Sequence, residues 1–346
     1  MRYNRQIILP EIGEAGQQKL RNASILVIGA GGLGCPVLQN LAAAGVGKIG
    51  IVDGDIIEET NLHRQLLYNL LDCGKSKAQT AAEKVQLLNP DVEAEVFNTF
   101  FSKNNAFEIV ANYQIIVDCT DTIAIRYLIN DVSVHQKIPV VYASIYKFEG
   151  QVSVFNYKNG PSYRCLFPEK NNLDTVTNCE VAGVLGVLPN TIGALQATEV
   201  FKIILGIGEI LTGKLLIYDA LHFQTQVIAF AKNPKAVEKS FINGSQLINA
   251  QKTNESLTPT AFLEKHKQLN IVVVDVREAN ENPEFKGENI VQIPLTALEK
   301  FSNQLDKNQE IVLFCQTGQR SQTALNYLKK SGFENVFHLE KGLQSL

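Results

Sequence analysis

Glycines and a carboxylate in the first part of the chain have the spacing of a nucleotide site. Residues 29–34 read GAGGLG, which fits G-x-G-x-x-G, and Asp53 follows at the end of the next expected strand. Such glycines permit a tight turn, the following helix presents its N-terminal N–H groups to phosphates, and a carboxylate placed like Asp53 can hold ribose hydroxyls. A tight turn without a ligand is the alternative interpretation, which the position of Asp53 disfavours.

Cations after the second expected strand favour attack on a phosphate over hydride transfer. The glycine pattern alone would favour NAD or FAD. However, residues 60–65 read TNLHRQ, and Lys77 opens the next expected helix. These cations suit an enzyme that attacks the α-phosphate of ATP, because charge builds up on the phosphoryl oxygens in the transition state. Asp121 ends another expected strand, and its carboxylate suits Mg²⁺ that the nucleotide also holds. Taken singly, Arg64 or Lys77 is most simply a solvated surface charge.

A cysteine in the last part of the chain has the surroundings of a reactive thiol. Residues 274–278 (VDVRE) end one expected strand, and residues 315–320 (CQTGQR) join another strand to a helix. A cysteine at the start of such a loop meets backbone N–H groups and a helix N-terminus, which stabilise an anionic sulfur, and Arg320 adds charge. The alternative interpretation of Cys315 is a buried cysteine at a strand end.

The elements that must position these residues predict two α/β units. In the first unit, strands and helices alternate, which gives a Rossmann-like, mostly parallel sheet with an antiparallel extension. Its parallel strands are expected at 24–29, 48–53, 115–119 and 139–143, its antiparallel strands at 151–157 and 215–219, and its helices at 32–44, 76–88 and 187–205. A polar loop is expected at 168–178. The second unit has expected strands at 271–275 and 311–315 and a helix from about residue 321.

Length and composition set the domain boundaries and exclude some functions. The chain has 346 residues, of which 45% are hydrophobic and 19% charged, which predicts a folded protein of two domains. We expect a first domain at 1–232, a polar linker at 233–256 and a small second domain at 257–346. A formal net charge of −3 argues against binding to nucleic acid or an anionic membrane. The N-terminus carries no apolar signal core, so we expect a cytoplasmic protein whose six cysteines are free thiols.

The first domain resembles the MoeB/ThiF family, the bacterial relatives of ubiquitin-activating enzymes, over residues 2–230. The stretches that carry the resemblance are 2–9 (RYNRQIIL), 29–35 (GAGGLGC), 61–65 (NLHRQ), 118–121 (DCTD), 149–151 (EGQ), 163–166 (YRCL) and 179–186 (CEVAGVLG). The resemblance implies that ATP adenylates the C-terminal glycine carboxylate of a ubiquitin-like sulfur-carrier protein of the MoaD or ThiS type. The products would be an acyl-adenylate and pyrophosphate.

The resemblance also implies roles for single residues. Asp53 would bind the ribose and Asp121 the Mg²⁺, while Arg5 would reach into the site of the other subunit of a homodimer. The nucleotide site would comprise Gly29, Gly31, Gly32, Gly34, Asp53, Asp55, Asn61, Arg64, Gln65, Lys77, Asp121 and Thr122. Thr122 stands where the family often has Asn. The residues expected to take part in catalysis are Arg5, Arg64, Lys77, Asp121, Cys179, Cys315 and Arg320.

Two features of the family's cysteines bear on metal and sulfur chemistry. Relatives usually hold a structural zinc on two C-x-x-C pairs, but here residues 162–165 read SYRC and residues 233–237 contain no cysteine. One thiolate cannot supply four ligands, so we expect no structural zinc. Cys179 matches the crossover-loop cysteine, which in some relatives takes part in thioester or persulfide chemistry; a thiol without a role is the alternative.

Residues 257–346 resemble a rhodanese domain, on the stretches VDVRE, CQTGQR and 336–342 (VFHLEKG). A related phosphatase loop typically has His before the cysteine and one more residue, so Phe314 and the shorter loop favour sulfur over phosphate. Where the family has a Gly-His-Ile segment, residues 287–290 read GENI in this chain. Where the family ends on two glycines, this chain has Lys341 and Gly342. These resemblances predict a two-step enzyme of a molybdopterin, thiamine or related sulfur pathway, loaded by a persulfide donor such as a cysteine desulfurase. The alternatives are a nicotinamide or flavin oxidoreductase and a non-catalytic scaffold that binds a ubiquitin-like protein.

Overall fold

The computed structural model describes residues 2–169, 183–252, 256–268, 270–279, 281–283, 285, 287, 289–302, 305–307, 309–333 and 335–346. The chain divides into two compact units, residues 1–248 and residues 249–346. In the part of the chain that is described, no helix has the length and apolarity needed to span a membrane.

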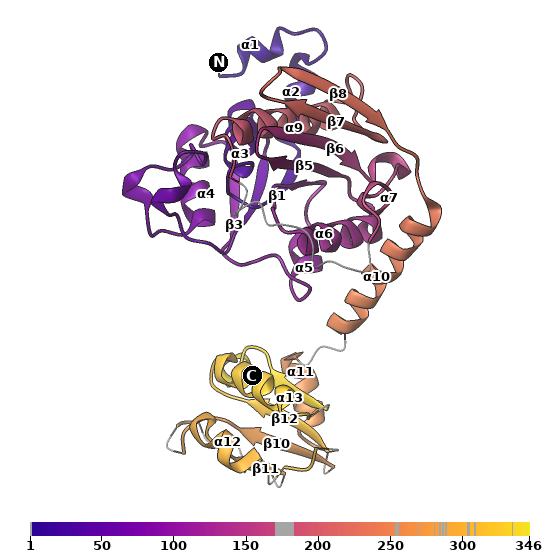
Figure 1. Ribbon diagram of the computed structural model, residues 1–346. Coiled ribbons are helices and arrows are strands. Elements are labelled where there is room, and N and C mark those ends of the chain that lie inside the picture. Colours follow the sequence, from indigo (N-terminus) through magenta and orange to yellow (C-terminus); the bar gives the residue numbers. More distant parts are fainter. Residues whose placement is uncertain are drawn as a thin grey trace. The chain divides into compact units, whose positions relative to one another are not determined.

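The first unit is built on one sheet, which contains eight strands among the described residues, in the order β3-β2-β1-β4-β5-β6-β7-β8 (Figure 1). Strands β1 to β5 run parallel, and β6, β7 and β8 continue the sheet antiparallel. The expected Rossmann-like sheet with an antiparallel extension is therefore confirmed. The strands are β1 (Ser24–Ile28), β2 (Lys48–Val52), β3 (Glu93–Phe97), β4 (Ile115–Asp118), β5 (Val140–Tyr146), β6 (Glu149–Phe155), β7 (Lys214–Asp219) and β8 (Gln224–Ala229).

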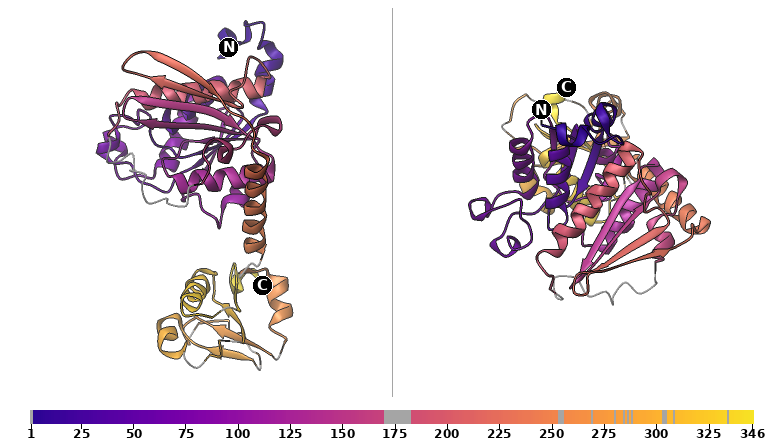
Figure 2. Two further views of the ribbon diagram at one scale, coloured as in Figure 1. Left: turned by 45° about the vertical axis from the view of Figure 1, so that its right-hand side comes forward. Right: turned by 90° about the horizontal axis from the view of Figure 1, so that it is seen from above.

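Helices cover both faces of the parallel part of this sheet (Figures 1 and 2). In β1, Ile25 and Val27 face one hydrophobic core, while Leu26 and Ile28 face the other, because successive side chains of a strand alternate. The first face packs against α2 (Gly13–Arg21), α3 (Gly34–Ala44), α4 (Lys77–Leu88) and α9 (Leu188–Leu205). The second face packs against α5 (Ala106–Val110), α6 (Ile123–Gln136) and α7 (Tyr163–Leu166).

The carboxyl ends of the central strands meet at one edge of the sheet. Strand β1 lies between β2 and β4, so the residues that follow these three strands are neighbours in space. They are Gly29 after β1, Asp53 after β2 and Cys119 after β4. In open parallel sheets this edge is where ligands bind.

The segment expected as a polar linker is largely helical. Helix α10 spans Pro234–Lys252 and is continuous in Figure 2. It packs on α6, since Ser240 Oγ accepts a hydrogen bond from Asn130, Asn243 Nδ2 donates to Asp131, and the Phe241 ring stacks on His135. Its inward residues recur every three or four positions, a helical period that the polar composition obscures.

The second unit is a smaller parallel sheet, with the described strands in the order β11-β10-β12-β13-β9. The strands are β9 (Ser256–Leu257), β10 (Ile271–Asp275), β11 (Ile290–Gln292), β12 (Glu310–Phe314) and β13 (Val336–Leu339). Two hydrophobic clusters lie on its two faces. The helices are α11 (Pro259–Lys265), α12 (Leu298–Phe301) and α13 (Gln319–Lys330). Cys315 directly follows β12, and α13 begins four residues later.

Candidate active sites

The glycine turn after β1 contains two kinds of glycine. At Gly29, which has φ +97°, an added Cβ would lie 2.8 Å from the Cys119 carbonyl oxygen, and at Gly34 it would lie 2.0 Å from the Gly29 oxygen. These two positions need glycine for the chain's own packing. At Gly31 the nearest atom to an added Cβ would be Gln65 Nε2 at 3.5 Å. Gly31 therefore leaves open space beside the backbone, as a bound ligand requires.

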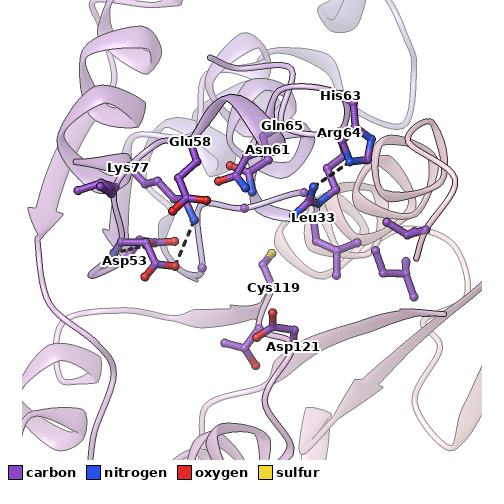
Figure 3. A pocket seen from close by; sticks show the side chains of 18 of the residues that line it. Leu33, Asp53, Glu58, Asn61, His63, Arg64, Gln65, Lys77, Cys119 and Asp121 are labelled. Atoms are coloured by element: carbon purple, nitrogen blue, oxygen red, sulfur yellow. Dashed lines mark hydrogen bonds and ion pairs between the residues drawn. The ribbon is translucent and has the colours of Figure 1, made fainter. Parts of the chain in front are cut away.

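A cavity of about 660 Å³ lies over this turn at the carboxyl edge of the sheet, within the size range of small-ligand sites. Most of the expected nucleotide-site residues line it, namely Gly29, Gly31, Gly32, Asp53, Asp55, Asn61, Arg64, Gln65, Lys77 and Asp121. Figure 3 shows Arg64 and His63 on one side of the cavity, Lys77 and Asp53 on the other, and Asp121 on the sheet side. Gly34 and Thr122 are not among the lining residues.

The Asp53 carboxylate ties the glycine turn to the end of β2. Its Oδ2 accepts a hydrogen bond from Ala30 N at 2.7 Å, and its Oδ1 accepts one from Asp55 N at 2.8 Å. Burial raises the pKa of Asp53, and these two backbone donors oppose the rise. Each carboxylate oxygen keeps a further lone pair for a donor such as a ribose hydroxyl.

Two of the expected cations reach the cavity, and each is held by neighbouring groups. Lys77 Nζ lies 3.1 Å from Asp55 Oδ2, and its side chain is only 10% exposed. Arg64 Nη1 donates to the Thr60 carbonyl at 3.0 Å and lies 2.8 Å from His63 Nε2. These contacts fix both cations before any ligand arrives, which is what electrostatic stabilisation of a transition state demands.

Gln65 offers a buried acceptor that lacks a partner. Its side chain is 4% exposed and lines the cavity, and its Oε1 has no hydrogen bond. An orphaned buried amide oxygen is costly and rare, so it indicates that a ligand donor completes this position. The glycine turn, the two cations and this oxygen together fit a nucleotide.

Two neighbouring carboxylates after β4 differ in environment. Asp118 is fully buried and accepts from both Thr120 N and Thr120 Oγ1, at 3.0 and 2.7 Å, and burial raises its pKa. Asp121 is exposed at the cavity and accepts from Thr122 Oγ1 at 3.2 Å. Asp121 is thus the carboxylate open to a hard cation that also binds phosphate oxygens.

Sequence reasoning missed four polar residues that line the cavity: Glu58, His63, Thr120 and Arg126. Arg126 Nη2 donates to the Thr120 carbonyl at 2.7 Å, and Nη1 donates to Ser144 Oγ at 3.2 Å. Arg126 lies in the first turn of α6, directly after the Asp121 segment. A basic residue one turn into the helix that follows such a carboxylate is the signal that could have identified it.

The remaining expected residues of the first domain lie elsewhere. Arg5 is exposed on α1 (Asn4–Ile7), which projects from the periphery of its unit (Figures 1 and 2), and it does not line the cavity of its own chain. Cys179 falls outside the described residues. Cys165 Sγ accepts from Ser162 N at 3.4 Å and from Asn233 N at 3.3 Å, so hydrogen bonds join α7 to the start of α10. Within the described residues, no three His, Cys, Asp or Glu side chains form a cluster that could hold a metal ion.

The Cys315 sulfur is buried and surrounded by donors. It accepts from Gly318 N at 3.1 Å and Ser321 N at 3.4 Å, and it lies 3.6 Å from Ser321 Oγ. Burial raises the pKa of this thiol, but the Ser321 hydroxyl and the N–H groups of the loop outweigh burial, so the pKa is lowered overall. Gly318 has φ +89°, and an added Cβ would lie 1.7 Å from the Glu340 oxygen, so the loop can close only with glycine there.

Both arginines near this loop have carboxylate partners. Arg320 contacts both oxygens of Glu281, at 2.5 and 2.7 Å, and holds the pKa of Glu281 down at about 2. Arg277 is 2% exposed, pairs with Asp275 at 2.7 Å, and donates to Gln316 Oε1 in the loop at 3.4 Å. Glu281 was not expected as a site residue, because nothing in the local sequence links it to Arg320.

Comparisons with known proteins agree with this geometry. The ThiF family model matches residues 3–239, and a rhodanese-like domain model matches residues 258–346. A probable adenylyltransferase/sulfurtransferase MoeZ of Mycobacterium tuberculosis is 38% identical, over 99% of this chain and 91% of its own length. A sulfur carrier protein adenylyltransferase of Thermus thermophilus is 47% identical, over 68% of this chain and 88% of its own.

A further relative matches nearly the whole chain, and one solved structure shares the fold over part of it. The adenylyltransferase and sulfurtransferase MOCS3 of Drosophila sechellia is 38% identical, over 95% of this chain and 78% of its own. A crystal structure of Escherichia coli MccB shares the fold, with a TM-score of 0.60 and 24% identity over 67% of this chain and 72% of its own. The expected family resemblances are confirmed: the chain belongs to the ThiF family, and its C-terminal part is a rhodanese-like domain.

Proposed function

We propose that the chain uses ATP to adenylate the C-terminal glycine carboxylate of a ubiquitin-like sulfur-carrier protein, and that its rhodanese-like domain supplies the sulfur for a thiocarboxylate. The observation that carries this proposal is the pairing of two sites in one chain. One is a cavity with a glycine turn and two fixed cations, and the other is a cysteine loop that favours a thiolate. The names of the relatives, adenylyltransferase and sulfurtransferase, support the same pair of activities.

In the first step, an oxygen of the carrier's carboxylate attacks the α-phosphorus of ATP, and pyrophosphate leaves. Charge on the phosphoryl oxygens rises during this step, and Arg64 and Lys77 are the groups that would stabilise it. Asp53 would accept from the ribose hydroxyls, and the N–H groups beside Gly31 would face the phosphates. The unpaired Gln65 Oε1 would accept a hydrogen bond from a donor group of the nucleotide.

Mg²⁺ is the metal that this step would use, and Asp121 is its proposed protein ligand. When bound, Mg²⁺ would neutralise charge on the leaving pyrophosphate. The residues present fit a Mg²⁺ ion, because the Asp121 carboxylate is exposed at the cavity. The buried Asp118 carboxylate instead accepts hydrogen bonds from Thr120. One carboxylate plus phosphate oxygens is a usual donor set for Mg²⁺.

In the second step, the Cys315 thiolate attacks the outer sulfur of a persulfide donor, such as a cysteine desulfurase, and the donor leaves as its thiol. The outer sulfur of the resulting Cys315 persulfide then attacks the acyl-adenylate carbonyl, and AMP leaves. A second thiol attacks the Cys315 sulfur, which releases the thiocarboxylate and forms a disulfide. Cys179 is a candidate for that thiol.

The proposed active form is a dimer of two identical chains in the cytoplasm. We take the active form as a cytoplasmic homodimer in which Arg5 of each chain completes the cavity of the other. Arg5 does not line the cavity of its own chain, which supports completion in trans. We further take the protein to bind no structural zinc, because Cys165 offers a single thiolate where four ligands are required.

The test of this function is ATP–pyrophosphate exchange with each candidate carrier protein from the same genome. Exchange that depends on one carrier and on its terminal glycine would support the proposal. A protein that reduces or oxidises a nicotinamide or flavin, or one that binds the carrier but exchanges no pyrophosphate, would refute it in favour of an oxidoreductase or a scaffold.

A further inference from the structure

A chain of polar side chains runs from the Cys315 sulfur to β9, an edge strand of the second unit's sheet. Ser321 Oγ lies 3.6 Å from Cys315 Sγ and 3.2 Å from His338 Nδ1, and His338 Nε2 lies 2.9 Å from Ser256 Oγ. The four residues come from four segments: the loop after β12, helix α13, strand β13 and strand β9. The proposed steps of sulfur transfer use neither His338 nor Ser256.

The His338 imidazole is buried, and its position is set by the pairing of β13 with β9. His338 is 1% exposed, and in the register of the parallel pair β13–β9 it stands beside Ser256. Both of its ring nitrogens have hydroxyl neighbours. A buried imidazole that uses both nitrogens has its tautomer set by those neighbours.

The proton count along the chain decides what Ser321 can do for the sulfur. A hydroxyl has one proton, and the Ser321 hydroxyl has three neighbours: Cys315 Sγ, His338 Nδ1 and the Gly318 carbonyl, which lies 3.0 Å away. If His338 carries its proton on Nε2, the bare Nδ1 competes for the Ser321 proton. If Nδ1 carries the proton, it donates to Ser321 Oγ, and the Ser321 proton is left for Cys315 or Gly318.

The Ser256 hydroxyl can serve the second arrangement, because a hydroxyl can donate as well as accept. When Ser256 donates to Nε2, the neutral imidazole carries its proton on Nδ1, so every donor in the chain points toward the sulfur. An anionic sulfur then attracts the Ser321 proton away from the neutral Gly318 carbonyl, because charge-assisted hydrogen bonds are the stronger ones. The geometry thus supplies a hydroxyl donor that responds when the thiol becomes a thiolate or a persulfide anion.

We infer that His338 is a positioning residue: its Nδ1–H, held by Ser256, keeps the Ser321 hydroxyl as a donor to the Cys315 sulfur. His338 does not touch the sulfur and acts through Ser321 alone. This inference rests on the proposed role of Cys315 as the nucleophile that carries sulfur. Charged groups beside the loop include the pairs Arg320–Glu281 and Arg277–Asp275, and substitutions at Ser321, His338 and Ser256 leave both pairs in place.

The test is the pH profile of Cys315 alkylation by iodoacetamide in the full-length chain, followed at the Cys315 peptide by mass spectrometry. The midpoint reports the thiolate, which the rate at one pH does not, since nucleophilicity also changes with pKa. We expect Ser321→Ala to raise the midpoint by about one pH unit, a tenfold loss of thiolate, as for a lost hydrogen bond to a charged group. We expect His338→Phe to raise it by about half a unit, and Ser321→Ala/His338→Phe to match Ser321→Ala alone.

Three further variants separate positioning from structural support. His338→Asn keeps an N–H donor near Ser321 and is expected to restore most of the wild-type midpoint. His266→Phe, a matched change at the C-cap of α11 in the same unit, is expected to leave the midpoint unchanged. Ser256→Ala, a milder change in case His338→Phe unfolds, is expected to give a small rise.

Several results would overturn the inference: an unchanged midpoint in folded His338→Phe or in Ser256→Ala, a double variant that shifts further than Ser321→Ala, or no rescue by Asn. Failure of the proposed function looks different. A chain whose midpoints behave as expected, but whose Cys315 takes up no sulfur from any persulfide donor, would refute sulfur transfer and leave the positioning role intact.

Discussion

Removal of the Lys77 ammonium group tests whether the cavity stabilises charge at a phosphate. The Lys77 side chain is 10% exposed, and its Nζ lies 3.1 Å from Asp55 Oδ2. At a partly buried site with an effective dielectric constant of about 20, a unit charge about 4 Å from another contributes about 4 kcal/mol. If this interaction forms mainly in the transition state, its loss slows the reaction by roughly 100- to 1000-fold.

Lys77→Ala should reduce activity much more than stability. The partner carboxylate of Asp55 is 54% exposed, so water solvates it once the lysine is gone, and the loss of this pair costs about 1 kcal/mol of unfolding free energy or less. The assay is ATP–pyrophosphate exchange with the carrier protein at saturating ATP, beside thermal unfolding of each variant. The matched control is Lys75→Ala, which removes a nearby lysine that pairs with Asp72 at 3.3 Å and does not line the cavity.

The comparison of Lys77→Ala with Lys75→Ala tests whether Lys77 acts on the reacting phosphate. We expect the Lys75→Ala protein to exchange pyrophosphate within about twofold of the wild-type rate, as is usual for a surface substitution. Equal, small losses in both variants would refute the assignment of Lys77 to the reacting phosphate and would leave it as a surface partner of Asp55.

Three other predictions follow from the same sites. Asp121→Ala should fold normally and lose Mg²⁺-dependent exchange by roughly 100-fold or more; near-normal exchange would remove Asp121 from the site. Arg5→Ala and Lys77→Ala chains should each be inactive alone, and an equal mixture of the two should regain about a quarter of all sites, because half of the dimers are then mixed and one of the two sites in each mixed dimer has both groups; no recovery after verified subunit exchange would contradict completion in trans. Cys315→Ala should abolish sulfur transfer to the carrier and spare adenylation, whereas Cys179→Ala should leave sulfur loading of Cys315 intact; thiocarboxylate formation lost only in Cys179→Ala would reverse these roles.

Local sequence patterns predicted the parts of the fold that local physics determines. The apolar runs of β1 and β2 and the glycine turn between β1 and α3 all lie within a residue or two of their expected ranges. Strands β3 and β8 of the first unit were missed; all six residues of β8 are exposed, so no buried face marks that strand, and four of the five residues of β3 are only half-buried. Helix α10 was missed because its inward positions include Ser240 and Gly244, which read as linker residues in a polar segment.

The parts of the sites that escaped prediction are those made by pairs distant in the sequence. Glu281 meets Arg320 through the fold, and Ser256 meets His338 only because β9 pairs with β13. No local pattern specifies which hydroxyl or carboxylate a buried side chain will meet, since tertiary packing chooses the partner. The same holds for Gln65, whose unpaired oxygen is visible only once burial and hydrogen bonds are known.

The Cys315 loop shows why such pairs matter for the chemistry. From the sequence, Arg320 was expected to lend its charge to an anionic sulfur; in the structure it hydrogen-bonds both oxygens of Glu281, which offsets part of that charge, and it still interacts electrostatically with Cys315. The sulfur instead accepts hydrogen bonds from the neutral N–H groups of Gly318 and Ser321, and the Ser321 hydroxyl lies 3.6 Å from it. Backbone N–H dipoles that point at Cys315 Sγ stabilise negative charge on that sulfur. The loop can therefore stabilise a thiolate through neutral donors beside the partly offset charge of Arg320, and the orientation of the Ser321 hydroxyl is the variable that His338 controls.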